Sequence, residues 1–305
     1  KITYGLSDNL LTIVALASRG PIVLAPTMDA DMYINPVTQQ NITKLQERGF
    51  LIVPPEEGEH ASGLKGPGRL PEIRSIIETI ERVLDHANQD LKGKRILVTA
   101  GPTHEAIDPV RYIGNRSSGK MGFAIANAAS LRGAAVTLVS GPVHLETPRN
   151  VERVDVESAE QMRDAVFKYA ASSDAVIMAA AVADYAPEKR AGAKIKKRSD
   201  AKQTSLSLSE TPDILNSLGQ KKNRGIVLVG FALETEDEIR NAQEKLKRKN
   251  LDLIVLNSLK DKGAGFGTDT NVVTILDKKG KIAKLPLMPK FNVANEILNR
   301  LKSLL

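Results

Sequence analysis

Short apolar runs alternate with longer amphipathic stretches along the chain, and this alternation limits the possible folds more than any other feature. Residues 95–100 form one such run, and residues 119–132, which are rich in small side chains, have the pattern of a helix. Further strands are predicted at 135–140, 174–181, 226–231, 253–256 and 272–276, with helices at 158–171, 236–249 and 290–304. Strands that alternate with helices predict an α/β protein whose sheet is mostly parallel and doubly wound.

A shorter version of the same pattern precedes residue 87. Its strands are predicted at 21–26 and 50–53, and its helices at 37–49 and 71–86. Residues 54–68 combine proline, glycine and charged residues, which predicts a loop. Residues 87–94 are polar and contain Gly93, so we predict two domains, at 1–86 and 95–305, joined by a linker at 87–94.

Composition narrows the class of protein. The chain of 305 residues is 42% hydrophobic, which is enough for the cores of about two domains. It contains no run of about 18 apolar residues, so we expect no membrane-spanning helix. The first residues lack the apolar region of a signal peptide and the chain has no cysteine, so we expect a cytoplasmic protein without disulfides. Because the chain begins at Lys1 and not at methionine, we expect it to start inside a longer protein or to have been trimmed.

The net charge of +7 fits a partner that carries phosphate, either a nucleic acid or a small molecule. Aromatic residues make up only 4% of the chain and tryptophan is absent, so bases would find few stacking surfaces. The four histidines show no metal-ligand spacing. These features favour small phosphorylated ligands over nucleic acid.

The segment 108–122, with the sequence DPVRYIGNRSSGKMG, is the strongest functional signal. Its glycines allow close approach of the backbone to a ligand, and the helix that follows offers unpaired N–H groups to phosphate. We therefore predict a phosphate or substrate loop formed by Arg111, Ser117, Ser118, Gly119 and Lys120. The alternative is a turn that only packs the helix on the sheet. The segment lacks the P-loop serine or threonine, because Met121 stands there, and it has only the second half of a Rossmann fingerprint.

Three later segments are candidates for ligand contact. The predicted strand at 174–181 leads to Asp184, which is suited to a metal ion or a hydroxyl group, or to a simple helix cap. The run Lys194-Ile195-Lys196-Lys197 suits a flap over a triphosphate, or a solvated loop. Residues 211–214 read as a helix start with Pro212 in its first turn, either a cap or a ligand contact.

Taken together, these segments resemble one family, the phosphopantothenate–cysteine ligases. The resemblance covers roughly residues 93–305 and rests on Gly101-Pro102-Thr103, residues 108–113, Asn115, residues 117–122, residues 180–185, residues 194–197, Pro212-Asp213-Ile214 and Gly230-Phe231, in the family's order. It implies a Rossmann-like fold and an amide-forming reaction between 4'-phosphopantothenate and cysteine that uses CTP and Mg²⁺ and proceeds through an acyl-cytidylate. It also implies a homo-oligomer with a dimeric ligase domain.

The resemblance assigns roles by matching position. Asn115 would contact the substrate and assist formation of the acyl-cytidylate, and Lys194 would serve its conversion. Asp184 is also the candidate ligand for Mg²⁺. The CTP site would be lined by Met178, Ala179, Ala180, Asp184, Lys194, Pro212, Asp213, Ile214, Leu215, Phe231, Lys245 and Lys249.

Residues 1–85 resemble the end of the flavin-dependent phosphopantothenoylcysteine decarboxylase that is fused ahead of this ligase. The resemblance implies the C-terminal part of a flavodoxin-like α/β flavoprotein domain that uses FMN, with substrate contacts at Met28, Asp29 and Met32. Asp29 stands where the family has asparagine, Tyr33 where it has tryptophan, and Ser62 where it has a proton-donating cysteine. A hydroxyl is a far weaker acid than a thiol, whose pKa is about 8.5. We therefore expect these residues not to decarboxylate a substrate by themselves.

Two alternatives from other classes remain. A nicotinamide-dependent oxidoreductase would need a complete G-x-G-x-x-G fingerprint, of which only Gly119-x-x-Gly122 is present. A non-catalytic flavoprotein-type subunit would bind without turnover. Pyrophosphate release that depends on CTP, magnesium and cysteine distinguishes a ligase from both.

Overall fold

The protein is described by a computed structural model that covers residues 1–86, 89–196, 205–222, 225–234, 237–258, 265 and 267–305. The chain divides into two compact units, Lys1–Asn88 and Gln89–Leu305. Within the described residues, no helix has both the length and the apolar character needed to cross a lipid bilayer.

The first unit is a small α/β arrangement around a parallel pair of strands, β1 (Val23–Leu24) and β2 (Leu51–Ile52). Its remaining elements are η1 (Ile2–Tyr4), α1 (Leu10–Ala17), α2 (Ala30–Ile34), α3 (Pro36–Glu47), β3 (Glu56–Glu59), β4 (Lys65–Arg69) and α4 (Ile73–His86). The loop predicted at 54–68 is wrong, because β3 and β4 form an antiparallel hairpin there. Glu59 faces Lys65 across it, so opposite charges replace the apolar alternation by which strands are recognised.

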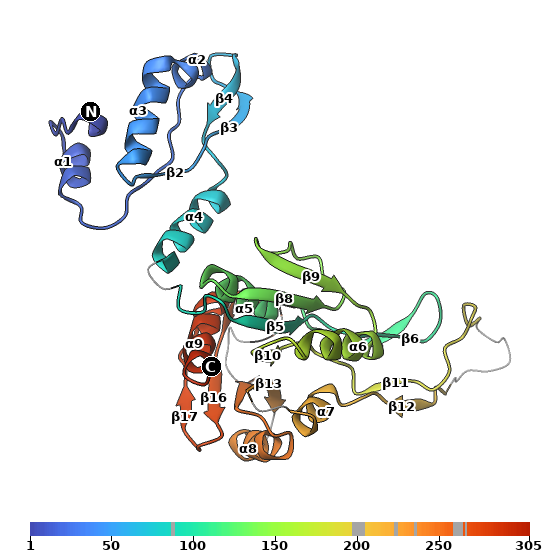
Figure 1. Ribbon diagram of the computed structural model, residues 1–305. Coiled ribbons are helices and arrows are strands. Elements are labelled where there is room, and N and C mark those ends of the chain that lie inside the picture. Colours follow the sequence, from blue (N-terminus) through green and yellow to red (C-terminus); the bar gives the residue numbers. More distant parts are fainter. Residues whose placement is uncertain (87–88, 197–204, 223–224, 235–236, 259–264, 266) are drawn as a thin grey trace. The chain divides into compact units, whose positions relative to one another are not determined.

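The second unit is built on one large sheet (Figure 1). In spatial order its described strands are β17 (Ile282–Lys284), β16 (Val273–Asp277), β14 (Leu253–Ser258), β13 (Val227–Glu234), β10 (Ala175–Met178), β5 (Arg95–Ala100), β8 (Ala135–Ser140) and β9 (Val151–Asp155). The strands from β14 to β9 are all parallel, whereas β16 and β17 are antiparallel at one edge. The prediction of a doubly wound, mostly parallel sheet is therefore confirmed.

Helices cover both faces of this sheet, as Figure 1 shows. The helices are α5 (Lys120–Leu131) and α9 (Lys290–Lys302) on one face, and α6 (Ala159–Ala170), α7 (Ile214–Gln220) and α8 (Glu238–Arg248) on the other. Successive residues of β5 point to opposite faces, so Ile96 packs with α5 while Leu97 packs with the other layer. Because both faces are buried, the central strands consist largely of apolar residues, and β10 (Ala-Val-Ile-Met) consists of them entirely.

Some short strands were not predicted. The edge strand β9, with the sequence VERVD, is only partly buried, so its two valines give a weak signal. The segment expected to be a loop before Gly119 contains the hairpin of β6 (His104–Ala106) and β7 (Tyr112–Gly114). Two more antiparallel pairs are β11 (Tyr185–Pro187) with β12 (Leu208–Glu210), and β15 (Thr270–Asn271) with β18 (Met288–Pro289). These pairs are too short for sequence periodicity to reveal.

One buried ion pair joins the beginning of the second unit to its helical layer. Arg132, which ends α5, donates to both carboxylate oxygens of Asp90 at 2.9 and 2.8 Å, and its side chain is only 5% exposed. Lys302 lies 3.1 Å from the same carboxylate. The hydrogen bond from Arg132 holds the pKa of Asp90 below its usual value. Ionised Asp90 therefore ties α5 and α9 to the start of the unit.

We expect Asp90→Asn to destabilise the protein by about 3 kcal/mol at neutral pH, because it leaves the buried Arg132 without its counter-charge. The unfolded pKa of an aspartate is about 3.9 and the folded one is lower. The stabilising effect of the pair is therefore full above about pH 4, and it falls as the pH drops towards the folded pKa. The measurement is denaturant unfolding from pH 3 to pH 7. Glu244→Gln, which breaks an exposed pair with Arg240, is the control, and an equal loss in both variants would contradict the assignment.

Candidate functional site

A cavity of about 630 Å³ opens at the carboxyl ends of β10 and β13, beside the start of α5. Ligands of open α/β sheets bind at this edge. The cavity brings together most of the candidate residues, namely Asn115, Ser117, Ser118, Gly119, Lys120, Met178, Ala179, Ala180, Asp184, Pro212, Asp213, Ile214, Leu215, Phe231, Lys245 and Lys249. Of the candidates in the second unit, Arg111 and Lys194 are not among the residues that line it.

The start of α5 lies directly against the end of β5. Gly119 caps this helix with a left-handed backbone angle, φ of 76°, which favours glycine. A side chain on Gly122 would place its Cβ 2.5 Å from the Cβ of Ala100 and 2.8 Å from the carbonyl oxygen of Thr99. The two glycines therefore allow the helix to begin at the edge of the cavity. Its first N–H groups and its dipole favour an anion there.

Asn115 connects this glycine-rich loop to the segment after β10. Its Nδ2 donates to the carbonyl oxygens of Ala181 and Val182, each at 3.1 Å. Both amide hydrogens are thereby used, and the Oδ1 atom is left as an acceptor on a side chain of fixed orientation. Asn115 also borders a second hollow of about 810 Å³, whose wall includes His104 stacked on Tyr112. The amide therefore stands between two adjoining spaces.

The opposite wall of the cavity contains an ion pair. Lys249 Nζ lies 2.9 and 2.8 Å from the two carboxylate oxygens of Asp213, which also accepts from the backbone N–H of Asn216. Burial acts to raise the pKa of Asp213, but the bonds from Lys249 and Asn216 outweigh it and the pKa is lowered. Asp213 is the N-cap of α7, which begins at Ile214. Pro212 thus precedes the helix, and its predicted place in the first turn is wrong.

Lys194 lies on an exposed segment, and hydrogen bonds to the backbone of the next residue, Ile195, hold that segment in place. The carboxylate of Asp108, which is 2% exposed, accepts from the backbone N–H of Ile195 at 3.1 Å and from the guanidinium of Arg111. Arg111 in turn donates to the carbonyl of Ile195 at 3.0 Å, and its bond holds the pKa of Asp108 far below the usual value. Arg111 therefore positions the segment next to Lys194. Lys197, the last residue of the basic run, lies outside the described residues.

The sequence interpretation missed several residues that line the cavity, above all Asn257, Gly265, Asn271 and Lys290. Lys290 begins α9 and is only 7% exposed. A lysine at the start of an amphipathic helix normally faces water, so the sequence around Lys290 does not mark it as a cavity residue. The polar run Thr268-Asp269-Thr270-Asn271 before a strand is the sequence signal that points to this part of the cavity.

In the first unit, the hairpin brings Ser62 to Asp29. The Ser62 hydroxyl donates to one carboxylate oxygen of Asp29, and this bond lowers the pKa of that carboxyl group. The other oxygen is enclosed and accepts no hydrogen bond within the described residues. Met28 precedes this aspartate and its N–H donates to Gly68, whereas Met32 is 60% exposed.

Fold and cavity together define the chain as a doubly wound α/β protein whose second unit offers a cationic cavity at the sheet edge. The family described as DNA/pantothenate metabolism flavoprotein C-terminal domain matches residues 91–305, and the flavoprotein family matches residues 1–85. The chain is 46% identical to the coenzyme A biosynthesis bifunctional protein CoaBC of Bacillus subtilis, over 100% of this chain and 75% of that protein.

Two further matches are informative. A protein named cysteine/cysteine sulfinic acid decarboxylase, from an unknown prokaryotic organism, is also 46% identical, over 100% of this chain and 85% of its own length. The crystal structure of the C-terminal domain of a CoaBC protein matches with a TM-score of 0.61 at 44% identity, covering 71% of this chain and 97% of that one. The chain belongs to the DNA/pantothenate metabolism flavoprotein family, the ligase and decarboxylase enzymes of coenzyme A biosynthesis.

We expect Gly122→Ala to destabilise the second unit by about 2 kcal/mol, because the new Cβ would collide with β5 and push α5 away. The displaced helix should also bind anions more weakly. Denaturant unfolding and phosphate titration measure the two effects. Gly192→Ala is the matched control, since its added Cβ would meet no atom within 4 Å. Equal stability of the two variants would show that the contact at Gly122 has no cost.

Proposed function

We propose that the second unit joins 4'-phosphopantothenate to cysteine at the expense of CTP, through an acyl-cytidylate. The observation that carries the proposal is the cavity itself, because the glycine-rich loop, the strand ends and the basic residues of α8 surround one space. The relatives named as coenzyme A biosynthesis bifunctional proteins support a reaction of coenzyme A biosynthesis. The proposal assigns the chemistry to residues 95–305, with 87–94 as a linker.

The reaction needs activation because a carboxylate is a poor acyl donor. A carboxylate oxygen attacks the α-phosphorus of the nucleotide, and the bond to the β-phosphate breaks to release pyrophosphate. The cysteine amine then attacks the acyl carbon, and CMP leaves with the electron pair of the broken C–O bond. Negative charge moves along the phosphate chain in the first step, so lysines and helix N–H groups fixed at the cavity wall stabilise it. Lys120 and the start of α5 line the cavity and would serve this role.

The two hollows that meet at Asn115 suit a reaction with two substrates. The nucleotide would occupy the cavity between α5, β10 and α7. The acid substrate would approach from the second hollow, so that its carboxylate passes the Asn115 side chain. Bonds to Ala181 and Val182 restrain that side chain, which keeps it in place for orienting the carboxylate.

Magnesium would enter with the triphosphate as part of the substrate. Mg²⁺ in such sites is held by one or two carboxylates together with phosphate oxygens. Asp184 lines the cavity and is the carboxylate we assign to it. The described residues contain no group of three or more histidine, aspartate or glutamate side chains that could hold a metal by itself, which fits an ion carried by the nucleotide. The ion would neutralise the phosphate charge.

FMN belongs with the flavoprotein unit, by the family that it matches. Ser62 donates to one carboxylate oxygen of Asp29, and the other oxygen accepts no hydrogen bond within the described residues. A hollow in this unit is lined by other residues, among them Ile2, Arg48 and Phe50. No decarboxylation step follows from these contacts, and we propose that the rest of the decarboxylase precedes residue 1.

The protein is also proposed to be a homo-oligomer with a dimeric ligase unit. Exposed apolar side chains support this, since Val110 beside β7 and Tyr112 within it are 61% and 55% exposed. Tyr185 and Leu208 on the β11–β12 pair are 50% and 47% exposed. Such side chains on projecting hairpins gain free energy when another surface covers them.

Incubation with CTP, Mg²⁺, 4'-phosphopantothenate and cysteine tests the ligase directly, with pyrophosphate and CMP as products. Release of CO₂ from cysteine without CTP use would instead favour the activity of the decarboxylase relative. We expect Asn115→Asp to slow pyrophosphate release at least tenfold, about the effect of like charges near each other in a shielded site. Asn299→Asp, on an exposed part of α9, is the control. Equal rates in the two variants would return Asn115 to a structural role.

We expect Lys194→Gln to form the acyl-cytidylate but to pass it slowly to cysteine, because Lys194 lies on a segment suited to covering a reactive intermediate. Its exposed position should keep the stability change within about 0.5 kcal/mol. Mass spectrometry of a cysteine-free incubation detects the intermediate, and addition of cysteine then reports the second step. Lys196→Gln, two residues away and also exposed, is the control. Normal turnover of Lys194→Gln would contradict the role.

A further inference from the structure

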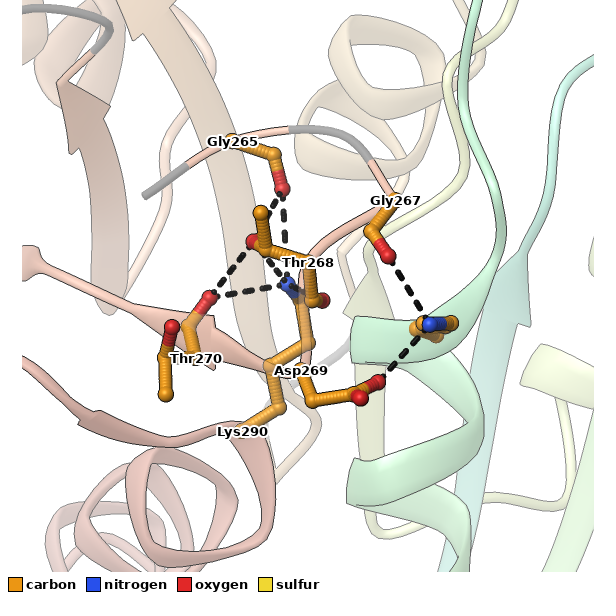
Figure 2. Close-up of polar contacts among 7 residues, drawn as sticks. Gly265, Gly267, Thr268, Asp269, Thr270 and Lys290 are labelled. Carbon is orange, nitrogen blue, oxygen red and sulfur yellow. Dashed lines mark hydrogen bonds and ion pairs between the residues drawn. The ribbon is translucent and has the colours of Figure 1, made fainter. Parts of the chain in front are cut away.

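Two lysines bind one polar loop at the edge of the cavity. The loop consists of Gly265 and residues 267–270, and Figure 2 shows it between the ends of two helices. Lys290, the first residue of α9, binds it from one side. Lys120, the first residue of α5, binds it from the other. Both lysines and Gly265 line the cavity at the carboxyl ends of β10 and β13.

Lys290 fixes the backbone of this loop. Its ammonium group donates to the carbonyls of Thr268 and Thr270, the latter at 3.0 Å, and lies 3.4 Å from that of Gly265. Its backbone N–H donates to the carbonyl of Asp269 at 2.9 Å. Burial, and then the nearby charge of Lys120, lower the pKa of Lys290. Since α9 is anchored in the core by residues such as Val293 and Ile297, the loop backbone is held in place.

Lys120 is bound differently. Its ammonium group lies 2.7 Å from the carboxylate of Asp269 and 2.8 Å from the carbonyl oxygen of Gly267. Asp269 is 89% exposed in its side chain, whereas that of Lys120 is 33% exposed. The hydrogen bond from Lys120 lowers the pKa of Asp269, so this carboxyl group is ionised at neutral pH. The pair is therefore a solvent-exposed ion pair at the cavity edge, which water and competing anions can reach.

A phosphate chain in the cavity would meet this pair. Lys120 follows Gly119 at the start of α5, where N–H groups already favour an anion. A phosphoryl oxygen at this point attracts the ammonium group and repels the carboxylate. Because Lys290 holds the loop backbone, the Asp269 side chain is tethered to a fixed point and cannot follow Lys120 inward. Phosphate and the Asp269 carboxylate therefore compete for the Lys120 ammonium group.

We propose that Asp269 is a positioning residue that acts through Lys120 and sets the affinity of the cavity for a phosphate chain. The carboxylate holds the ammonium group at the cavity edge in the empty protein and gives it up when a polyphosphate binds. This inference rests on the proposed function only in taking the cavity as the triphosphate site. It gives the polar loop a role as a competitor for the phosphate-binding lysine.

Inorganic tripolyphosphate tests the proposal without turnover. Its dissociation constant is measured by titration calorimetry, without metal, at an ionic strength of about 0.1 M. At this ionic strength, charges that lie within about 10 Å of each other still interact. The proteins are the parent, Asp269→Asn, Lys120→Met and the double variant. Glu160→Gln, which breaks an exposed pair with Arg163 on α6, is the control for the same change in net charge.

We expect Asp269→Asn to tighten tripolyphosphate binding about fivefold, the equivalent of one exposed ion pair. The same substitution should have little effect when Lys120 is already methionine, and Glu160→Gln should leave binding unchanged. This dependence on Lys120 distinguishes positioning from a general change in charge or structure. The high exposure of Asp269 makes a folding defect easy to exclude by a melting curve.

The outcomes separate the two proposals. If the parent binds tripolyphosphate and Asp269→Asn binds it equally well or more weakly, the inference is overturned but the triphosphate site remains. A gain of equal size in the Lys120→Met background would also overturn it, because the effect would then not pass through Lys120. A parent protein that binds no tripolyphosphate at all would remove the triphosphate site itself, and the role of Asp269 with it.

Discussion

The close packing of α5 on β5 is the constraint on which the rest of the site depends. Without a side chain at Gly122, the helix axis approaches the strand until neighbouring atoms leave no room for a Cβ. The helix then begins at the carboxyl edge of the sheet, where Gly119 turns the chain with a positive φ. Its free N–H groups and Lys120 consequently face the cavity. The start of α5 and the small residues after β10, Ala179 to Ala181, line the same cavity. Small side chains there leave room for a flat ligand to lie against the backbone.

Charge around the cavity is arranged in two ways. Lys249 is 12% exposed and is paired with Asp213, which also caps α7, so that pair is part of the fold. Lys120 is paired with an aspartate in full contact with solvent, so that pair stabilises little and is easily exchanged. Lys290 donates its ammonium hydrogens to neutral carbonyl oxygens, and these hydrogen bonds order a loop. A cationic wall thus contains both fixed charges and one that is free to move to a ligand.

The resemblance places Ser62 and Asp29 of the first unit at the positions of a proton-donating cysteine and an asparagine in the decarboxylases. Ser62 donates its proton to Asp29 and therefore is not held ready to donate it elsewhere. A hydroxyl group also gives up a proton far less readily than a thiol. The carboxylate at Asp29 adds negative charge where a carboxylate substrate would approach, and like charges repel most where water is excluded. The pair fits a structural contact between the β3–β4 hairpin and the start of α2 better than an acid catalyst.

The sequence by itself determined the doubly wound sheet, because its central strands are buried on both faces and must therefore be mostly apolar. It also located the glycine-rich loop and the small residues after β10, since close approach of backbone to backbone demands those residue types. It did not reveal β9 or the charged hairpin of β3 and β4, whose exposed residues carry little hydrophobic pattern. Only the tertiary structure decided the partners of Lys120 and Lys290. Those contacts join residues that lie 149 and 22 positions apart in the chain, and only the packing of α9 beside α5 brings them to one loop.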